Sequence, residues 1–264
     1  MNNMKTQIIL FASAVLMVCS CQKENLAEVS TAKNSVVATI EEDTKTTVNG
    51  TDVTWKENDQ IAIAYYNSGS ITVPYKLDNT YAGQKQGVFT GEEISFAGDC
   101  YAVYPYSIAG YKNGVKFDFA TSVTQDAAEN VGKYMQMYST PFKMGEKVEF
   151  HHLNCALKVT INPSSETTIS RIEVTNKYGK DHPSKSYTVT KGVITFSDGN
   201  LSTVTLNINE TISGPKDYYI ALAPKTNPSN SWTVTVYYGT SSYKQAPINN
   251  TLEAGKLYTG SFNL

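Results

Sequence analysis

Hydrophobic and polar residues alternate over short stretches of the chain from residue 35 onward. Alternation with a period of two residues predicts a β-strand with one buried face. Asn, Gly, Asp and Ser separate these stretches, as turn residues do. The one stretch with helical character, 125–133, is short and contains Gly132. The strands expected in the first half are 36–40, 53–55, 60–66, 71–77, 87–90 and 101–104.

A second series of alternating stretches begins at Ile169. Within it, the dipeptide Asp198-Gly199 lies between the stretches 192–196 and 201–208. An Asp-Gly pair between two alternating stretches is typical of a β-hairpin, so we expect these two strands to pair. The strands expected in this half are 170–174, 186–189, 192–196, 201–208, 218–222, 232–238 and 257–262.

The longest alternating stretch covers residues 148–161. Leu153, Leu157 and Ile161 fall on one face of it, whereas Val148 and Phe150 have the opposite parity. A two-residue period cannot change phase without an extra residue. We therefore expect a bulge or bend near His151-His152.

The best candidate for a domain boundary is Asn162-Pro163-Ser164-Ser165, which ends the long strand. A similar order of strand motifs before and after it fits two related sandwiches. We expect an all-β fold of two tandem antiparallel β-sandwich domains, residues 35–163 and 164–264. The expected core comprises Trp55, Ile61, Ile63, Phe89, Val103, Phe150, Leu153, Leu157 and Val159, then Ile172, Val174, Ile194, Phe196, Val204, Leu206, Ile220, Leu222, Val234 and Leu257.

The N-terminus has the pattern of an export signal: Lys5, an apolar run over 8–18, and then Cys19-Ser20-Cys21. The run is too short to span a membrane, which takes about 20 apolar residues. The residues before Cys21 resemble a bacterial lipobox, in which that cysteine receives lipid and becomes the mature N-terminus. The alternative is an ordinary signal peptide cut near Ser20. We expect residues 1–20 to be the signal peptide and 21–34 a polar tether, with acyl chains holding the protein on a membrane.

Charge and cysteine content exclude several classes of function. The 22 Lys and Arg residues nearly balance the 24 Asp and Glu residues, and no basic stripe suggests a nucleic-acid partner. After Cys21 the chain has two cysteines, Cys100 and Cys155, which are either buried free thiols or one disulfide. No Cys/His spacing suggests zinc, and we expect no metal and no cofactor.

We find no constellation of residues typical of an enzyme, and therefore expect no catalysis. His151 and His152 are neighbours on a strand and point to opposite faces unless the expected bend brings them together. The acidic pairs of the chain, such as Glu92-Glu93, lie in turn-like surroundings. Tyrosine is abundant, and its adjacent pairs place one ring inside and one outside a sheet, where the outer rings could bind sugars or a partner.

Several motifs, taken in order, resemble the fimbrillin family (Mfa-like) of lipoproteins from the Bacteroides group. The most telling is Trp55-Lys56-Glu57-Asn58-Asp59, which precedes a strand in the "W-x-x-x-D" manner of that family. The resemblance covers nearly the whole chain after the signal peptide. Its other motifs are 42–46, 89–91, 101–105, 150–159 and 252–258.

The resemblance implies two β-sandwich domains of transthyretin type, anchoring to the outer membrane, and a place in fimbriae that mediate adhesion. In that family a trypsin-like cut at an early Arg or Lys removes the lipid and a first strand. The opened groove then accepts a strand from the next subunit, a case of strand addition to a sheet edge.

This sequence departs from that scheme because its only arginine, Arg171, lies in the second half. The candidate processing residues are therefore Lys33 and Lys45, and we expect an uncleaved anchor, accessory or tip subunit. A polymerising stalk subunit is the outcome if either lysine is cut. The alternative from another class is a glycan-binding surface lipoprotein of a polysaccharide uptake system, and a hydrolase is the third reading.

Overall fold

The structure is a computed structural model, and it describes residues 33–41, 53–67, 69–106, 110–112, 116–129, 131–176, 181–198, 202–227 and 232–264. The expected signal peptide, Cys21 and Lys45 lie outside these residues. Strands joined by turns and loops make up the described part, which contains no α-helix, so the all-β class is confirmed. Two short 3₁₀ helices are present, η1 (Asn79–Tyr81) and η3 (Val131–Tyr134). None of the described helices is long and apolar enough to cross a membrane.

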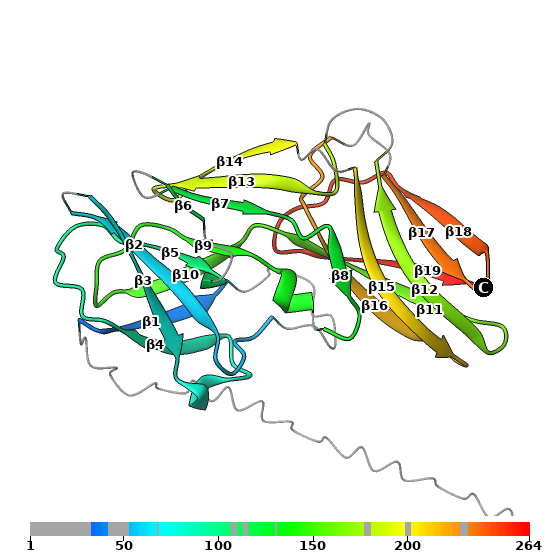
Figure 1. Ribbon diagram of the computed structural model, residues 1–264, viewed down its shortest axis with the longest axis horizontal. Coiled ribbons are helices and arrows are strands. Elements are labelled where there is room, and N and C mark those ends of the chain that lie inside the picture. Colours follow the sequence, from blue (N-terminus) through cyan, green and yellow to red (C-terminus); the bar gives the residue numbers. More distant parts are fainter. Residues whose placement is uncertain are drawn as a thin grey trace, which may run out of the picture. The chain divides into compact units, whose positions relative to one another are not determined.

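Seven strands from the first part of the chain form a sheet that closes on itself (Figure 1). Their order around the ring is β1-β10-β9-β5-β2-β3-β4, and β1 closes it by pairing with both β10 and β4. The inward side chains of this closed sheet form one core around Trp55, Phe89 and Phe150, called the ring core below. The strands are β1 (Ser35–Ile40), β2 (Gln60–Tyr66), β3 (Ser70–Leu77), β4 (Gln86–Gly91), β5 (Tyr101–Tyr104), β9 (Met137–Ser139) and β10 (Lys147–His152).

The W-x-x-x-D motif builds the entry into β2. Trp55 is buried in the ring core, where its indole meets Phe89 edge to face at a centroid distance of 4.8 Å. Asp59 closes the turn that follows, because its Oδ2 accepts the Lys56 N–H at 2.7 Å and its Oδ1 accepts the Tyr104 hydroxyl at 3.0 Å. The motif therefore holds a turn against the core and has a structural role.

Two further sheets enclose a second core. The three-stranded sheet has the order β16-β11-β19 and the five-stranded sheet the order β18-β17-β12-β15-β8. Leu157 and Val159 of β11 pack with Trp232 and Val234 of β17 in this core. The strands are β8 (Thr124–Asp126), β11 (Cys155–Asn162), β12 (Thr167–Thr175), β15 (Thr203–Ile212), β16 (Lys216–Leu222), β17 (Trp232–Tyr238), β18 (Ser242–Ile248) and β19 (Leu257–Asn263).

A four-stranded sheet with the order β14-β13-β7-β6 covers part of the outer face of the closed sheet. Phe117 and Tyr187 of this sheet share a core with Ala62 and Val103 from β2 and β5. The strands are β6 (Gly110–Lys112), β7 (Lys116–Ala120), β13 (Lys185–Thr190) and β14 (Val193–Asp198).

The long strand expected over 148–161 is two strands with a break between them. β10 ends at His152 and β11 begins at Cys155, so the chain bends at residues 153–154, next to the expected position. The two strands join different sheets, which explains why the alternation changes phase. The expected boundary at 163/164 follows directly after β11 and stays a prediction.

The stretch 125–133, which has some helical character in the sequence, contains the end of β8, a turn and the start of η3. Two expectations about local structure are wrong. Residues 53–55 form no strand. The stretches 192–196 and 201–208 do not pair, because β14 pairs with β13, while β15 lies between β12 and β8. The reason is the turn Lys191-Gly192, whose two φ angles of 49° and 76° are those of a tight hairpin turn.

Three members of the expected core are less buried than the alternation predicts. Ile194 is half-buried and Phe196 is 57% exposed, because both lie on β14 at the open edge of its sheet. Leu257 is half-buried at the start of β19, which is also an edge strand. Alternation identifies the face of a strand that points inward, but not whether a neighbouring strand covers it.

Candidate functional site

β1 is the element on which the candidate site is built. Val36, Ala38 and Ile40 alternate along it, and each is at most 2% exposed in the ring core. Burying a Val or Ile side chain completely contributes roughly 1.5–3 kcal/mol. β1 also pairs on both sides, parallel to β10 and antiparallel to β4. This strand therefore fills one position in a closed sheet, and its loss would leave two open strand edges.

The end of β1 is fixed to β10 by backbone and side-chain contacts. The Glu41 N–H donates to the Phe150 carbonyl at 2.9 Å, and Glu41 Oε2 lies 2.7 Å from His151 Nδ1. His151 is half-buried and His152 is buried, so the two rings take opposite faces as expected. Burial is the largest cause that lowers the pKa of His152, to about 4. The charge of Glu41 acts in the opposite direction, and His151 and Lys85 lower the pKa by smaller amounts.

Of the two candidate processing residues, the structure places Lys33, which is exposed and precedes β1. Its carbonyl accepts the Ile94 N–H at 3.0 Å, and the next carbonyl, of Asn34, accepts the Gly91 N–H at 3.0 Å. The peptide bond after Lys33 is therefore held against the segment that follows β4. Lys45 lies outside the described residues, as does Cys21, the expected lipidation residue.

Cys100 and Cys155 are both buried and both free. Cys100 belongs to the ring core and forms a backbone bridge with Phe142, whereas Cys155 begins β11 and belongs to the core of the other two sheets. Burial raises the pKa of the Cys100 thiol to about 11 and that of Cys155 to about 12. Both cysteines are therefore neutral thiols at neutral pH.

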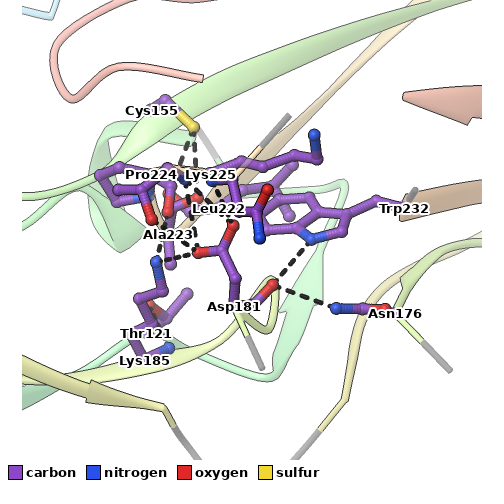
Figure 2. A network of polar contacts seen from close by, with 12 residues as sticks. Thr121, Cys155, Asn176, Asp181, Lys185, Leu222, Ala223, Pro224, Lys225 and Trp232 are labelled. Carbon is purple, nitrogen blue, oxygen red and sulfur yellow. Dashed lines mark hydrogen bonds and ion pairs between the residues drawn. The ribbon is translucent and has the colours of Figure 1, made fainter. Parts of the chain in front are cut away.

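A buried polar network surrounds Asp181 (Figure 2). Asp181 has a φ of 77° and accepts the ammonium of Lys185 at 2.5 Å, and Lys185 also donates to the Pro224 carbonyl at 2.7 Å. The side chains of Lys185 and Asp181 are only 4% and 7% exposed. The Asp181 carbonyl accepts the Trp232 indole N–H at 2.8 Å. The network thus ties the start of β13 to the segment after β16.

The charge state of Asp181 follows from these contacts. Burial by itself raises the pKa of this carboxyl, but the hydrogen bond from Lys185, the N–H groups of Asn227 and Thr226 and the positive charge of Lys185 outweigh it. The pKa of Asp181 is therefore below its usual value, and the group is ionised at neutral pH. Every charge in this pair is matched, which is the arrangement of a structural ion pair.

Two neighbouring tyrosines, Tyr237 and Tyr243, lie on the five-stranded sheet. The Arg171 guanidinium lies 3.6 Å from the ring centroid of Tyr237, and Glu173 accepts both Arg171 Nε at 2.7 Å and the Tyr237 hydroxyl at 2.9 Å. Tyr243 of β18 lies beside Tyr237 at a centroid distance of 6.1 Å and is 58% exposed. Tyr238 instead packs against the core, so this pair has one ring on each face.

The model of one protein family, described as fimbrillin-like, matches residues 44–264. The chain belongs to the fimbrillin-like family. No curated relative matches its sequence. This membership supports a role as a fimbrial subunit at the cell surface, in contact with other fimbrial subunits.

Solved structures agree with the fold of this fimbrillin-like protein. A candidate cell adhesion protein of Bacteroides uniformis ATCC 8492 is 17% identical, with a TM-score of 0.58 over 87% of this chain and 92% of that one. Another from Bacteroides ovatus ATCC 8483 is 14% identical, with a TM-score of 0.57 over 87% of this chain and 91% of that one. At these identities the likeness concerns the fold alone.

Sequence reasoning did not find the contacts that hold the site of this fimbrillin-like protein together. In the sequence, Glu41 is one of three consecutive acidic residues in an expected turn. No sequence pattern pairs it with His151, which lies 110 positions further along the chain. Lys185 and Asp181 have a usable signal, because they are four residues apart and of opposite charge, but the spacing alone does not indicate burial. Among the described residues no group of three His, Cys, Asp or Glu could hold a metal ion.

Proposed function

We propose that this fimbrillin-like protein is a lipid-anchored accessory subunit of fimbriae, at the anchor or the tip, that takes part in adhesion and does not form the stalk. Family membership supports the fimbrial role. The lipobox-like residues before Cys21 support attachment to the outer membrane through acyl chains. The absence of arginine before β1 supports a chain that keeps both its lipid and its first strand.

The observation that carries the proposal is the place of β1 in the closed sheet. A subunit can accept a strand from a neighbour only where a sheet has an open edge. With β1 in place, β4 and β10 are both paired, so the strand-accepting position is already filled by this chain's own residues. At the closed sheet, the addition of a neighbour's strand then requires that β1 leaves. Alternatively, this chain supplies the strand to another subunit.

The two candidate processing lysines would have different effects. A cut after Lys33 separates the lipid-bearing segment from β1 but leaves β1 joined to the rest of the chain. A cut after Lys45 falls on the other side of β1, which would then be held by noncovalent contacts alone. Only the second cut prepares the chain to exchange β1 for the strand of a neighbour.

We also propose that the described part divides near Pro163 into two related β-sandwich domains of transthyretin type. The three-stranded and five-stranded sheets that share one core support a sandwich in the second half. In this arrangement β11, which precedes Pro163, supplies Leu157 and Val159 to the core of the second domain.

Shearing cells that produce the protein, and examining the released fimbriae by immunogold electron microscopy, tests the proposed role. We expect label at one end of the fimbriae, and incorporation of a palmitate analogue that is lost in Cys21→Ala. Label along the whole length of the fimbriae would make the protein a stalk subunit. Label that stays on cell bodies, with fimbriae unchanged when the protein is deleted, would remove it from fimbriae altogether.

The cluster of Arg171, Tyr237 and Tyr243 favours a second candidate, a glycan-binding surface lipoprotein. The exposed ring of Tyr243, beside a paired Arg and Glu, suits the face and hydroxyls of a sugar. Retention of the protein on immobilised polysaccharides tests this function, with Tyr243→Ala expected to release it. Tyr66→Ala is a matched control, because Tyr66 is 57% exposed and Tyr243 58%. No retention of the unaltered protein, or equal loss in both variants, would contradict this function.

A further inference from the structure

β14 is an edge strand with one side open. It pairs with β13 from Thr190↔Val193 to Lys185↔Asp198, and among the described residues it has no second hydrogen-bonded neighbour. Figure 1 shows β14 as the outermost strand of its sheet, beyond β13. The backbone N–H and C=O groups on its outer side are therefore available to another strand.

This edge also exposes apolar side chains. Val193 is 65% exposed and Phe196 57%, and they are two of the five large hydrophobic residues that are exposed in the described part. From Val193 to Ser197 the strand contains no charged residue and no proline. An uncharged, apolar edge strand is the feature that natural proteins normally avoid unless another chain covers it.

The other edges of the described sheets are charged, interrupted by proline, short, or without exposed large apolar side chains. β18 contains Lys244 and Pro247, and β16 begins with Lys216 and Asp217, all of which oppose pairing with a further strand. β6 and β8 have three residues each. β19 shows only small residues along its exposed middle, including Gly260. β14 alone combines length, neutrality and exposed large apolar side chains.

The sequence of β14 is complementary to itself. When a two-fold axis relates two antiparallel strands, the axis is perpendicular to the sheet, and each copy keeps the same face on the same side. With Thr195 on the axis, Ile194 lies opposite Phe196 of the second copy, and Phe196 opposite Ile194. Pairs of an aromatic and a β-branched residue, and Thr–Thr pairs, are favourable cross-strand neighbours.

Both residues of that pair lie on the inner face of their sheet. In the β13 register, Ile194 is opposite Val189 and Phe196 opposite Tyr187, and Val189 and Tyr187 are each 2% exposed. The second copy would thus cover Phe196 and extend the apolar inner face, while Val193 would meet Ser197 on the outer face. This register places no charged residue opposite another.

We propose that β14 is an interface between two copies of this chain, which join their four-stranded sheets edge to edge about a two-fold axis at Thr195. This interface is separate from β1 and does not depend on the proposed fimbrial role. It would pair the copies laterally, whereas exchange of β1 would link subunits in sequence.

Cysteine cross-linking on cells that produce the full chain tests the proposal. Thr195→Cys meets itself across the axis, so a short bis-maleimide should give a covalent dimer in a denaturing gel. Val193→Cys is the matched control, because Val193 and its copy lie four positions apart along the strands, about 13 Å. The native thiols Cys100 and Cys155 are buried and should not react.

A second change separates a specific interface from chance encounters. Adding Phe196→Lys to Thr195→Cys places charges on the edge and should lower the cross-linked fraction at least fivefold. Phe196 is mostly exposed, so the unfolding temperature should stay the same. Equal cross-linking of Thr195→Cys and Val193→Cys, no effect of Phe196→Lys, or cross-linking to a different protein would each overturn the proposal.

Discussion

At the residue scale, the sequence identifies most of the buried side chains but not their polar partners. Ile63, Phe89 and Leu157 are buried as their alternation predicts, because an apolar side chain needs only an inward position. His152 and Asp181 are also buried, although both are titratable. Their burial depends on contacts with residues far away in the sequence, which no local pattern encodes.

His152 should make the stability of the protein depend on pH. Its pKa is about 4 when folded, against 6.5 for an ordinary histidine, because burial disfavours the charged form. A lowered pKa means that the folded state binds the proton less well. The stabilising contribution is therefore complete above pH 6.5 and is lost as the pH falls from 6.5 to about 4. At about 1.36 kcal/mol per pH unit, the loss is roughly 3 kcal/mol.

Urea unfolding at pH 7 and pH 4 measures this loss, and His152→Gln should reduce the difference between the two free energies of unfolding by roughly 3 kcal/mol. His151→Gln is the control, because it leaves His152 in place and removes an adjacent, partly exposed histidine. An equal pH dependence in His152→Gln and in the unaltered protein would show that His152 is not buried as a neutral group.

Asp181→Asn should strongly destabilise the fold. The substitution leaves the Lys185 ammonium buried without its counter-ion, which costs about 3–5 kcal/mol. Asn tolerates the left-handed backbone that Asp181 adopts, so the loss reports the charge. Asp217→Asn is the matched control, because Asp217 pairs with Lys158 at the surface and its loss should be far smaller. Similar thermal unfolding of both variants would contradict a buried ion pair.

At the element scale, alternation predicts where most strands lie, but not which strands pair. β2, β3, β12 and β17 lie close to their expected positions. The short strands β6, β8 and β9 have three residues each, too few for a period to be visible. Pairing depends on turn geometry, and here the Lys191-Gly192 turn determines the hairpin of β14 where the sequence suggests Asp198-Gly199.

Leu157→Ala tests the position of β11. Leu157 is 5% exposed on a strand that lies between β16 and β19, so its truncation should lower the free energy of unfolding by roughly 2–5 kcal/mol. Ser261→Ala on the neighbouring β19 is exposed and should change it little. A loss below about 0.5 kcal/mol for Leu157→Ala in denaturant unfolding would show that β11 is not central.

At the scale of the whole molecule, the order of loose motifs indicates the family better than any single motif does. The W-x-x-x-D motif has a structural role, since Asp59 closes the turn that places Trp55 in the core. The closed sheet completed by β1 could not be read from the sequence, because β1 pairs with β10 across more than 100 residues. The proposed role of the first strand in assembly depends on this closure.

The most direct test of the central claim, that β1 stays in place and the protein does not polymerise, is an immunoblot of sheared surface material. Samples are run in SDS with and without boiling, because fibres linked by inserted strands resist SDS until they are heated. We expect one band of uncleaved size in both lanes, associated with membranes, and the same result for Lys45→Gln. A ladder that collapses on boiling, and that disappears in Lys45→Gln, would show that β1 is released and that the protein forms the stalk.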